Sequence, residues 1–238
     1  MRGIVMKLVK LNGCILYSIA LVLTLTSPLA SADGITLGGT RIIYPAGAKQ
    51  ASISVRNTST NAAYLVQSWT ENANGEKSAD FIVTPPLYVS NGGDENMLRL
   101  MYSGPSLPSD RESLYYFNSR AVPSIDKNKA ENKSVLMLAT TTRIKLFVRP
   151  AGLKPTADKA PDLLKFNRIG NQLEIDNPSP YYLTLVKMNL NGRKVEDVMV
   201  SPKSRANITL PAGDGNVLNF STMTDYGAPT DTKTAFLN

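Results

Sequence analysis

Two cations in this chain stand among large apolar residues. Arg41 directly precedes Ile42-Ile43-Tyr44, and Lys145 lies within the run Ile144-Lys145-Leu146-Phe147. A charge in such surroundings is costly unless an anion or water reaches it. Arginine offers a planar fork and lysine a point charge, so Arg41 and Lys145 could together hold one carboxylate. The alternative for each cation alone is an ordinary solvated position at the rim of a strand.

The residue types exclude most catalytic chemistry. The 238 residues contain no His and a single Cys, Cys14. Catalytic triads and dyads that need His are therefore excluded, as are His-ligated zinc or copper sites, CxxC metal knuckles and an intrachain disulfide. Enzymes built on carboxylates, Lys or Tyr are left open. A glycosidase needs two carboxylates about 5–10 Å apart, and no motif here indicates such a pair. We expect no enzyme activity, no metal site and no cofactor.

Residues 1–32 are predicted to be a secretory signal that is cleaved. Three cations in the first ten residues precede an apolar run at 15–25, and Ala30-Ser31-Ala32 offers small side chains for cleavage. The alternative is a membrane anchor, but the run has about half of the roughly 20 residues that span a bilayer. Cys14 would leave with the signal, and no membrane insertion is expected afterwards.

The charge balance gives no reason to expect nucleic-acid binding. The whole chain carries a formal charge of +7, and removing the three cations of the signal leaves 7 − 3 = +4. That excess is modest, and an exported protein rarely meets nucleic acid. A basic surface that aids solubility is sufficient to explain it.

Short runs rich in Val, Ile, Thr, Tyr and Leu alternate with turn signals, which predicts an all-β fold. About 200 residues fit two immunoglobulin-like sandwiches better than one. Proline and glycine in Arg149-Pro150-Ala151-Gly152 favour a boundary there, so we predict domains at 33–150 and 151–238. The predicted strands cover residues 34–44, 51–56, 63–69, 97–102, 113–119, 135–148, 163–168, 172–176, 181–189, 195–200, 205–210 and 217–223.

The strand predicted at 135–148 carries more apolar surface than one sheet face needs. Val135, Met137 and Ala139 would lie on one face, and Leu136 and Leu138 on the other. A half-buried antiparallel strand normally alternates apolar and polar residues. Either both faces are covered inside the protein, or one face is kept for a partner.

Several ordered motifs make the whole chain after the signal similar to one family, the periplasmic pilus (fimbrial) assembly chaperones. The family consists of exported proteins with two immunoglobulin-like β-sandwich domains in an L-shape. A short loop at 122–133 and the lack of cysteine after the signal resemble its short-loop branch. The matching motifs are Thr40-Arg41, Tyr64 followed by Trp69, Thr84-Pro85-Pro86, Asp110-Arg111-Glu112-Ser113-Leu114-Tyr115-Tyr116-Phe117-Asn118, Arg143-Ile144-Lys145-Leu146-Phe147-Val148-Arg149-Pro150, Asn177-Pro178-Ser179-Pro180-Tyr181-Tyr182 and Asp225-Tyr226-Gly227.

The resemblance implies a role for the apolar strand. Family members fill the open groove of an incomplete pilus subunit with this strand, a case of strand addition. The donated side chains would be Leu136, Leu138 and Thr140. Thr140 stands where the family usually has a third large apolar residue, so the resemblance implies either weaker binding of the subunit or greater reliance on Leu136 and Leu138. The C-terminal carboxylate of the subunit would bind Arg41 and Lys145, and so fix the register.

The resemblance also implies a polar bridge between the domains, formed by Glu112, Arg149 and Asp225. Expected partners are fimbrial subunits and an outer-membrane usher, in the periplasm. Ala63 stands where relatives often have a proline linked to usher docking, so the usher contact transfers less directly. Self-association of the unloaded protein is a further possibility. The rival interpretation is a secreted structural fimbrial subunit or adhesive immunoglobulin-like module, which would appear in sheared fibres rather than in the periplasm.

Overall fold

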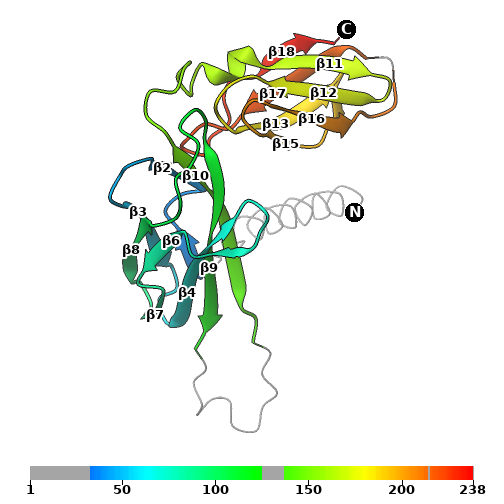
Figure 1. The fold of residues 1–238 in the computed structure, drawn as a ribbon. Helices are drawn as coiled ribbons and strands as arrows, with labels where there is room; N and C mark the ends of the chain where they lie inside the picture. Colours follow the sequence, from blue (N-terminus) through cyan, green and yellow to red (C-terminus); the bar gives the residue numbers. More distant parts are fainter. Residues whose placement is uncertain (1–32, 125–136, 214, 238) are drawn as a thin grey trace, which may run out of the picture. The chain divides into compact units, whose positions relative to one another are not determined.

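The computed structural model describes residues 33–124, 137–213 and 215–237, and these residues form an all-β protein (Figure 1). The predicted signal, residues 1–32, lies outside the described residues. Within the described ranges, no helix has the length and apolar character needed to cross a membrane. Two hydrophobic clusters form, one from residues between Ile42 and Val148 and the other from residues between Ala160 and Leu237. The chain is therefore built as two sandwiches, as the sequence predicts.

The N-terminal sandwich packs two sheets around the first cluster. One sheet has the order β1-β3-β8-β6, and the other has the order β2-β10-β9-β4-β5, with β7 paired to β4. Inward-facing residues such as Val55, Leu98, Phe117 and Leu146 come from both sheets and are completely buried. The strands are β1 (Ile35–Leu37), β2 (Arg41–Pro45), β3 (Ala51–Asn57), β4 (Tyr64–Asn72), β5 (Lys77–Ser78), β6 (Phe81–Thr84), β7 (Leu87–Ser90), β8 (Glu95–Tyr102), β9 (Ser113–Pro123) and β10 (Thr140–Arg149).

The C-terminal sandwich has sheets of order β11-β12-β16 and β14-β13-β17-β18, with β15 paired to β13. A buried asparagine ends a strand in each sandwich: Asn177 donates to backbone carbonyls of Tyr181, Val200 and Ser201, and Asn57 makes the equivalent set of bonds. The elements are the 3-10 helix η1 (Ala160–Leu163) and the strands β11 (Lys165–Ile169), β12 (Gln172–Asn177), β13 (Leu183–Leu190), β14 (Arg193–Lys194), β15 (Val198–Val200), β16 (Ser204–Thr209), β17 (Val217–Thr222) and β18 (Lys233–Phe236).

The single first strand predicted at 34–44 is wrong, because the structure divides it between two sheets. β1 pairs antiparallel with β3, whereas β2 pairs parallel with β10. The chain changes sheet at Gly38-Gly39, where Gly38 donates its amide to the Ser54 carbonyl at 2.8 Å. A Cβ on Gly38 would lie 2.2 Å from the Ser54 hydroxyl oxygen. A larger residue at this position would therefore require the Ser54 hydroxyl to move.

The strand predicted at 135–148 is shorter in the structure. β10 begins at Thr140, and the described residues before it, 137–139, are not paired in a sheet. The even positions Ile144, Leu146 and Val148 are buried in the chain's own core. Further from the core, the first four residues of β10 are exposed. β10 is therefore exposed over its first four residues and largely buried from Ile144 onward.

Two tyrosines of the N-terminal sandwich differ in whether their buried hydroxyl groups have hydrogen-bond partners. The Tyr44 hydroxyl donates to the Ala48 carbonyl at 2.6 Å and accepts the Tyr102 amide at 3.2 Å. The Tyr88 hydroxyl is buried and has no hydrogen-bond partner among the described residues, and this burial raises the pKa of Tyr88 to about 12. An unmade hydrogen bond of a buried group costs stability, whereas a made one contributes to it.

We expect Tyr44→Phe to lower the free energy of unfolding by about 1–3 kcal/mol, because it leaves two backbone groups without their partner. Tyr88→Phe should leave stability unchanged or raise it, because the hydroxyl that it removes has no partner. Urea unfolding of both variants measures the difference. An equal loss in both variants would contradict this account of the core.

Candidate functional site

Arg41 and Lys145 are direct neighbours across two parallel strands. In the register of β2 and β10, Arg41 is the Cα partner of Lys145. Ile42 and Ile144 turn into the core, so the two cations share the opposite face of the sheet. The Lys145 ammonium donates to the Thr184 hydroxyl of β13 at 3.1 Å. The Arg41 Nε is buried and has no partner in the described parts of the chain.

The two cations lie in a setting that favours an anion. Burial lowers the pKa of Arg41, and the carboxylates of Asp225 and Glu112 oppose that effect. Burial and then the neighbouring Arg41 lower the pKa of Lys145. Arg41 also lines a cavity of about 250 Å³, slightly smaller than the roughly 300–1,000 Å³ of small-molecule sites. Lys145 is not among the residues that line this cavity, whereas the carboxylates of Glu112, Asp158 and Asp225 are. At the pair Arg41 and Lys145 itself, a carboxylate would offset two half-buried positive charges.

Glu112, Arg149 and Asp225 are brought together beside this site. Arg149 donates from Nε to Glu112 at 2.7 Å, and from its two terminal nitrogens to Asp225 at 2.6 and 2.7 Å. The second Glu112 oxygen accepts the Tyr182 amide at 2.8 Å. Glu112 is only 3% exposed, and burial raises its pKa while Arg149 opposes this rise. Arg149 therefore links the end of β10 to the turn that follows β17.

The turn that holds Asp225 also lies against β2. Gly227 has a φ of +81°, and a Cβ at this position would lie 2.0 Å from the Thr40 hydroxyl oxygen. A side chain at position 227 would therefore be strained by the backbone conformation and would displace the Thr40 side chain. Thr40-Arg41 and Asp225-Tyr226-Gly227, which are far apart in the sequence, meet at this point. The residues on both sides of the contact belong to the motifs that the sequence analysis singled out.

The apolar segment before β10 is exposed rather than buried. Leu138 is 68% exposed and Met137 48% exposed, and Thr140 is exposed as well. Burial of both faces inside the protein, the first alternative in the sequence analysis, is therefore wrong for Met137 and Leu138. Leu136, the other predicted donor residue, lies outside the described residues, as does most of the predicted short loop, from residue 125 onward. Within β10, Thr140 is on the same face as Ile144 by strand parity, whereas Leu138 lies before the strand begins.

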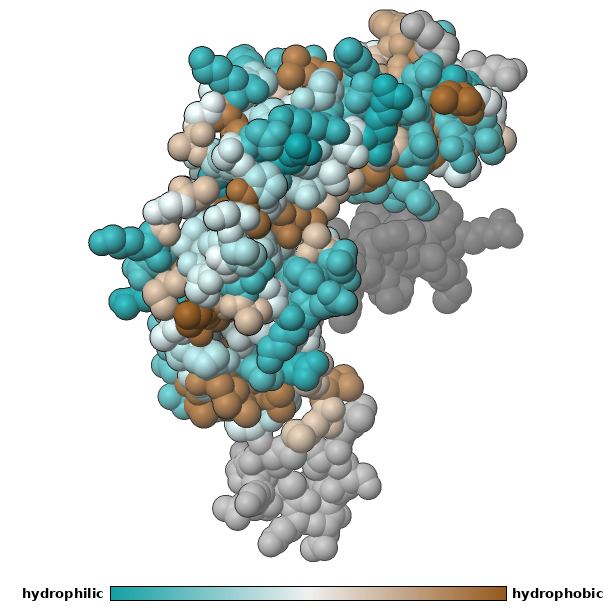
Figure 2. Space-filling view, in the orientation of Figure 1, coloured by the Kyte–Doolittle hydropathy of each residue, from teal (hydrophilic) through white to brown (hydrophobic). Residues whose placement is uncertain are grey.

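Sequence reasoning missed a second exposed apolar surface, formed by Leu65 of β4 with Leu87 and Val89 of β7. Leu65 and Val89 are Cα partners across these strands, and all three residues are exposed. Figure 2 shows hydrophobic side chains gathered at the end of the N-terminal sandwich where β4 and β7 lie in Figure 1. The sequence did contain a sign of this surface, because the adjacent Leu65 and Val66 place an apolar side chain on each face of β4.

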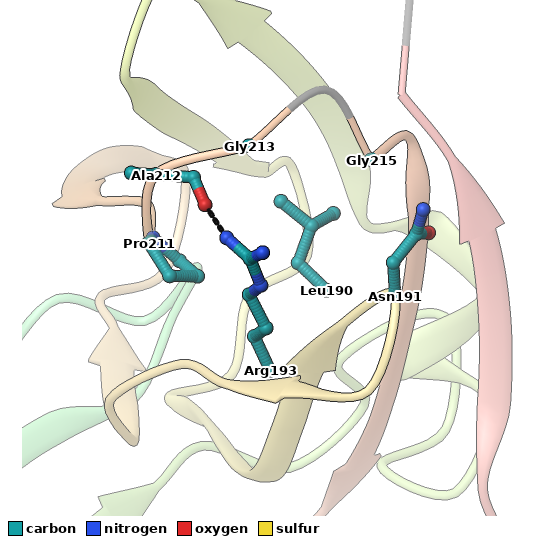
Figure 3. A pocket seen from close by; sticks show the side chains of 7 residues that line it. All are labelled: Leu190, Asn191, Arg193, Pro211, Ala212, Gly213 and Gly215. Carbon is teal, nitrogen blue, oxygen red and sulfur yellow. Dashed lines mark hydrogen bonds between the residues drawn. The ribbon is translucent and has the colours of Figure 1, made fainter.

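A pocket in the C-terminal sandwich lies beside a loop that two arginines hold in place (Figure 3). Arg193, which lines it, donates to the Ala212 carbonyl. Arg168 donates to the carbonyls of Gly213 and Gly215, each at 2.7 Å. Both guanidinium groups therefore bind backbone oxygens of one loop. Over the described ranges, no group of three or more Asp, Glu, His or Cys residues could hold a metal ion.

Comparison with family models gives matches over both sandwiches. Residues 34–154 match the model described as pili and flagellar-assembly chaperone, PapD N-terminal domain. Residues 159–234 match the model described as pili assembly chaperone PapD, C-terminal domain. Together the two matches span most of the chain.

Two similar proteins from Escherichia coli K12 are named as chaperones. The probable fimbrial chaperone SfmC is 46% identical over 216 residues, which cover 91% of this chain and 94% of that protein. The chaperone protein FimC is 41% identical over 234 residues, which cover 98% of this chain and 97% of that protein.

Two solved structures are similar in fold. The periplasmic chaperone SfaE aligns with a TM-score of 0.74 and 38% identity, over 86% of this chain and all of that chain (100%). A complex of the Salmonella enterica SafA pilin with the SafB chaperone aligns with a TM-score of 0.79 and 29% identity, over 87% of this chain and 98% of that chain.

Arg149→Met should lower the free energy of unfolding by about 3–5 kcal/mol near neutral pH, because it strands the buried Glu112 carboxylate. Without Arg149, only the bond from the Tyr182 amide would oppose the effect of burial, so the pKa of Glu112 would stay above the ordinary value of about 4.3. The stability loss is then fully present at high pH and shrinks as the pH falls towards about 4, where Glu112 takes up a proton.

Urea unfolding of the wild type and of Arg149→Met, each near neutral pH and near pH 4, measures how the stability loss depends on pH. The matched control is Glu112→Gln added to Arg149→Met, which should restore much of the lost stability. A loss of the same size at both pH values would contradict the role of the stranded charge.

Proposed function

This chain belongs to the pilus-assembly chaperone family, and from that premise we propose that it captures a pilus subunit with its own strand β10 and the residues just before it. It is a fimbrial chaperone rather than a structural fimbrial subunit, because both halves match chaperone models. The role is one of binding and folding, and we propose no catalytic step.

The exposed segment at the start of β10 carries the proposal. Leu138, the more exposed of its two large apolar side chains, is 68% exposed. It precedes the part of β10 that pairs with β9 but not with β2, because the pairing with β2 reaches only from Lys145 to Arg149. An exposed apolar segment beside such an open strand edge is suited to pairing with another chain.

Once strand structure extends back through residue 138 on pairing with a subunit, Leu138 and Thr140 would share a face with Ile144 and Leu146, which fill the chain's own core. One stripe of side chains would thus run from the chaperone's core into the open groove of the subunit, with Leu136 extending it.

Arg41 and Lys145 would fix the register of that pairing. A one-residue slip of a strand turns all its side chains to the other face. A carboxylate held by two cations at one end of β10 would prevent such a slip. The fork of Arg41, whose Nε has no partner among residues 33–124, 137–213 and 215–237, supports binding of the C-terminal carboxylate of the subunit.

The other roles follow from the same premise. Glu112, Arg149 and Asp225 would hold the two domains together, with the boundary at residue 150. Leu65, Leu87 and Val89 offer an apolar surface next to Ala63, which suits docking to an outer-membrane usher. The site of action would be the periplasm, after cleavage of residues 1–32. Without a subunit, the exposed Leu138 segment would favour self-association of two chaperone copies.

Arg41→Ala and Lys145→Ala should each give a folded, exported protein that no longer co-purifies with its subunit, because the carboxylate loses half of its binding site. Arg99→Ala, which removes an exposed cation of β8 in the other sheet, is the matched control and should co-purify normally. Pull-down from the periplasm after co-expression measures the outcome. Normal co-purification by both anchor variants would rule out the carboxylate anchor.

Leu138→Glu should abolish subunit capture, because a charge would enter an apolar groove. The position is exposed in the free protein, so thermal unfolding of the variant should match the wild type. Ile82→Glu on β6 removes an exposed apolar residue of the other sheet and serves as the control. Subunits accumulating normally with Leu138→Glu would mean that this strand is not the one donated.

A further inference from the structure

Arg143 is a third cation on the face of the sheet that carries the proposed carboxylate anchor. It lies two positions before Lys145 on β10, so the two residues face the same side, about 6.5 Å apart along the strand. β2 pairs with β10 only from Lys145 to Arg149. Arg143 therefore lies beside the open edge of β10, on the stretch that a subunit must pass when its end is held at Arg41 and Lys145.

The Arg143 side chain is turned away from that edge. Its guanidinium carbon lies 3.8 Å from the centre of the Tyr116 ring on β9. One terminal nitrogen pairs with the Glu71 Oε2 of β4 at 3.0 Å, and a Cβ on Gly75, in the turn after β4, would lie 3.4 Å from the same nitrogen. Because the strand order is β2-β10-β9-β4, the charge of Arg143 is held two strands away from the edge where the subunit would bind.

Glu71 is itself held in place. Its Oε1 accepts the Trp69 indole N–H at 3.0 Å, while its Oε2 pairs with Arg143. The Glu71 side chain is 17% exposed and that of Arg143 is 44% exposed. A pair that water reaches this easily contributes little to the stability of the fold. Its main consequence is therefore the place at which it holds the Arg143 charge.

The place of this charge matters because strand facing alone does not fix the register. A slip of one residue turns every side chain to the other face, but a slip of two residues keeps each on its own face. Such a slip would bring the terminal carboxylate of the subunit from Lys145 to Arg143. A guanidinium without a partner would compete for that carboxylate, and the pairing with Glu71 removes this competitor.

We propose that Glu71 is a positioning residue for subunit capture. By holding Arg143 over Tyr116 and away from the open edge, it leaves Arg41 and Lys145 as the site for the terminal carboxylate and disfavours a slip of two residues. The inference rests on the proposed function, because it takes the C-terminal carboxylate of the subunit as the occupant of the anchor. It adds a residue that selects the register without contact with the subunit.

Disulfide cross-linking between the full mature chain and its subunit tests the inference, because it reports the register directly. The chaperone carries Thr141→Cys on the face of Lys145, and no other cysteine is expected in it, because Cys14 lies in the predicted signal. Single cysteines are placed along the last strand of the subunit, and the one that cross-links best to the otherwise unchanged chaperone defines the anchored register. A cysteine two residues nearer the subunit's C-terminus reports the slipped register, because the slip moves the subunit towards Leu138.

We expect Glu71→Gln to raise the ratio of slipped to anchored cross-links about two- to fivefold, the size of one solvent-exposed ion-pair contact. Glutamine keeps an acceptor for the Trp69 indole, so thermal unfolding should stay close to the wild type. Adding Arg143→Met removes the competing cation and should return the ratio to the wild-type value. Glu174→Gln, which breaks a cross-strand pair with Arg205 in the other sandwich, is the matched control and should leave the ratio unchanged.

Three results would overturn the inference. One is an unchanged ratio in Glu71→Gln, and another is the same rise when Arg143→Met is added, because the effect would then not pass through Arg143. The third is loss of both cross-links in Glu71→Gln, which would mean that Glu71 acts through the fold rather than on the register.

A further arm separates the inference from the proposed function. Lys145→Ala should lose the anchored cross-link. If it does so while Glu71→Gln leaves the ratio unchanged, the anchor stands and only the role of Glu71 is wrong. If Lys145→Ala keeps the wild-type cross-link, or the chaperone with Thr141→Cys alone forms none, the proposed capture at the anchor fails and the inference fails with it.

Discussion

The parallel pairing of β2 with β10 is the constraint on which the rest of this structure depends. It places Arg41 opposite Lys145 and turns both away from the core, while Ile42, Ile144 and Leu146 turn inward. A shift of β2 by one residue would turn Arg41 towards the core and Ile42 away from it, so Arg41 would no longer share a face with Lys145. The facing of β10 itself, and so of Lys145 and the residues from Thr140 onward, is set by its antiparallel pairing with β9.

In the proposed function the same strand would contribute to two cores. Its second half is buried in the chaperone's own core, and the segment before it is exposed and would be covered by a bound subunit. Burying one leucine-sized side chain contributes about 1.5–3 kcal/mol, so Leu138 in a subunit groove would be a substantial part of the binding energy. Thr140 adds less because of its smaller apolar area. The cost is an apolar surface open to solvent in the unloaded protein.

Residue patterns predicted the all-β class and the two sandwiches, because strand alternation and turn residues are local properties. The family motifs drew attention to Arg41, Lys145, Glu112, Arg149 and Asp225 before their geometry was known. Local patterns could not show that β1 and β2 belong to different sheets, since the change at Gly38 depends on the approach of Ser54. The Thr184 partner of Lys145 and the Glu71 partner of Arg143 depend on contacts between distant segments.

A cysteine scan of positions 137–141 would test the central claim, the lending of this strand, most directly. Each single-cysteine variant is treated with a thiol reagent, alone and bound to the subunit. The account predicts that subunit binding protects positions 138 and 140, whose side chains enter the groove, and leaves 137, 139 and 141 reactive, because strand residues alternate between faces. Equal protection at all five positions, or protection of the odd ones, would contradict it.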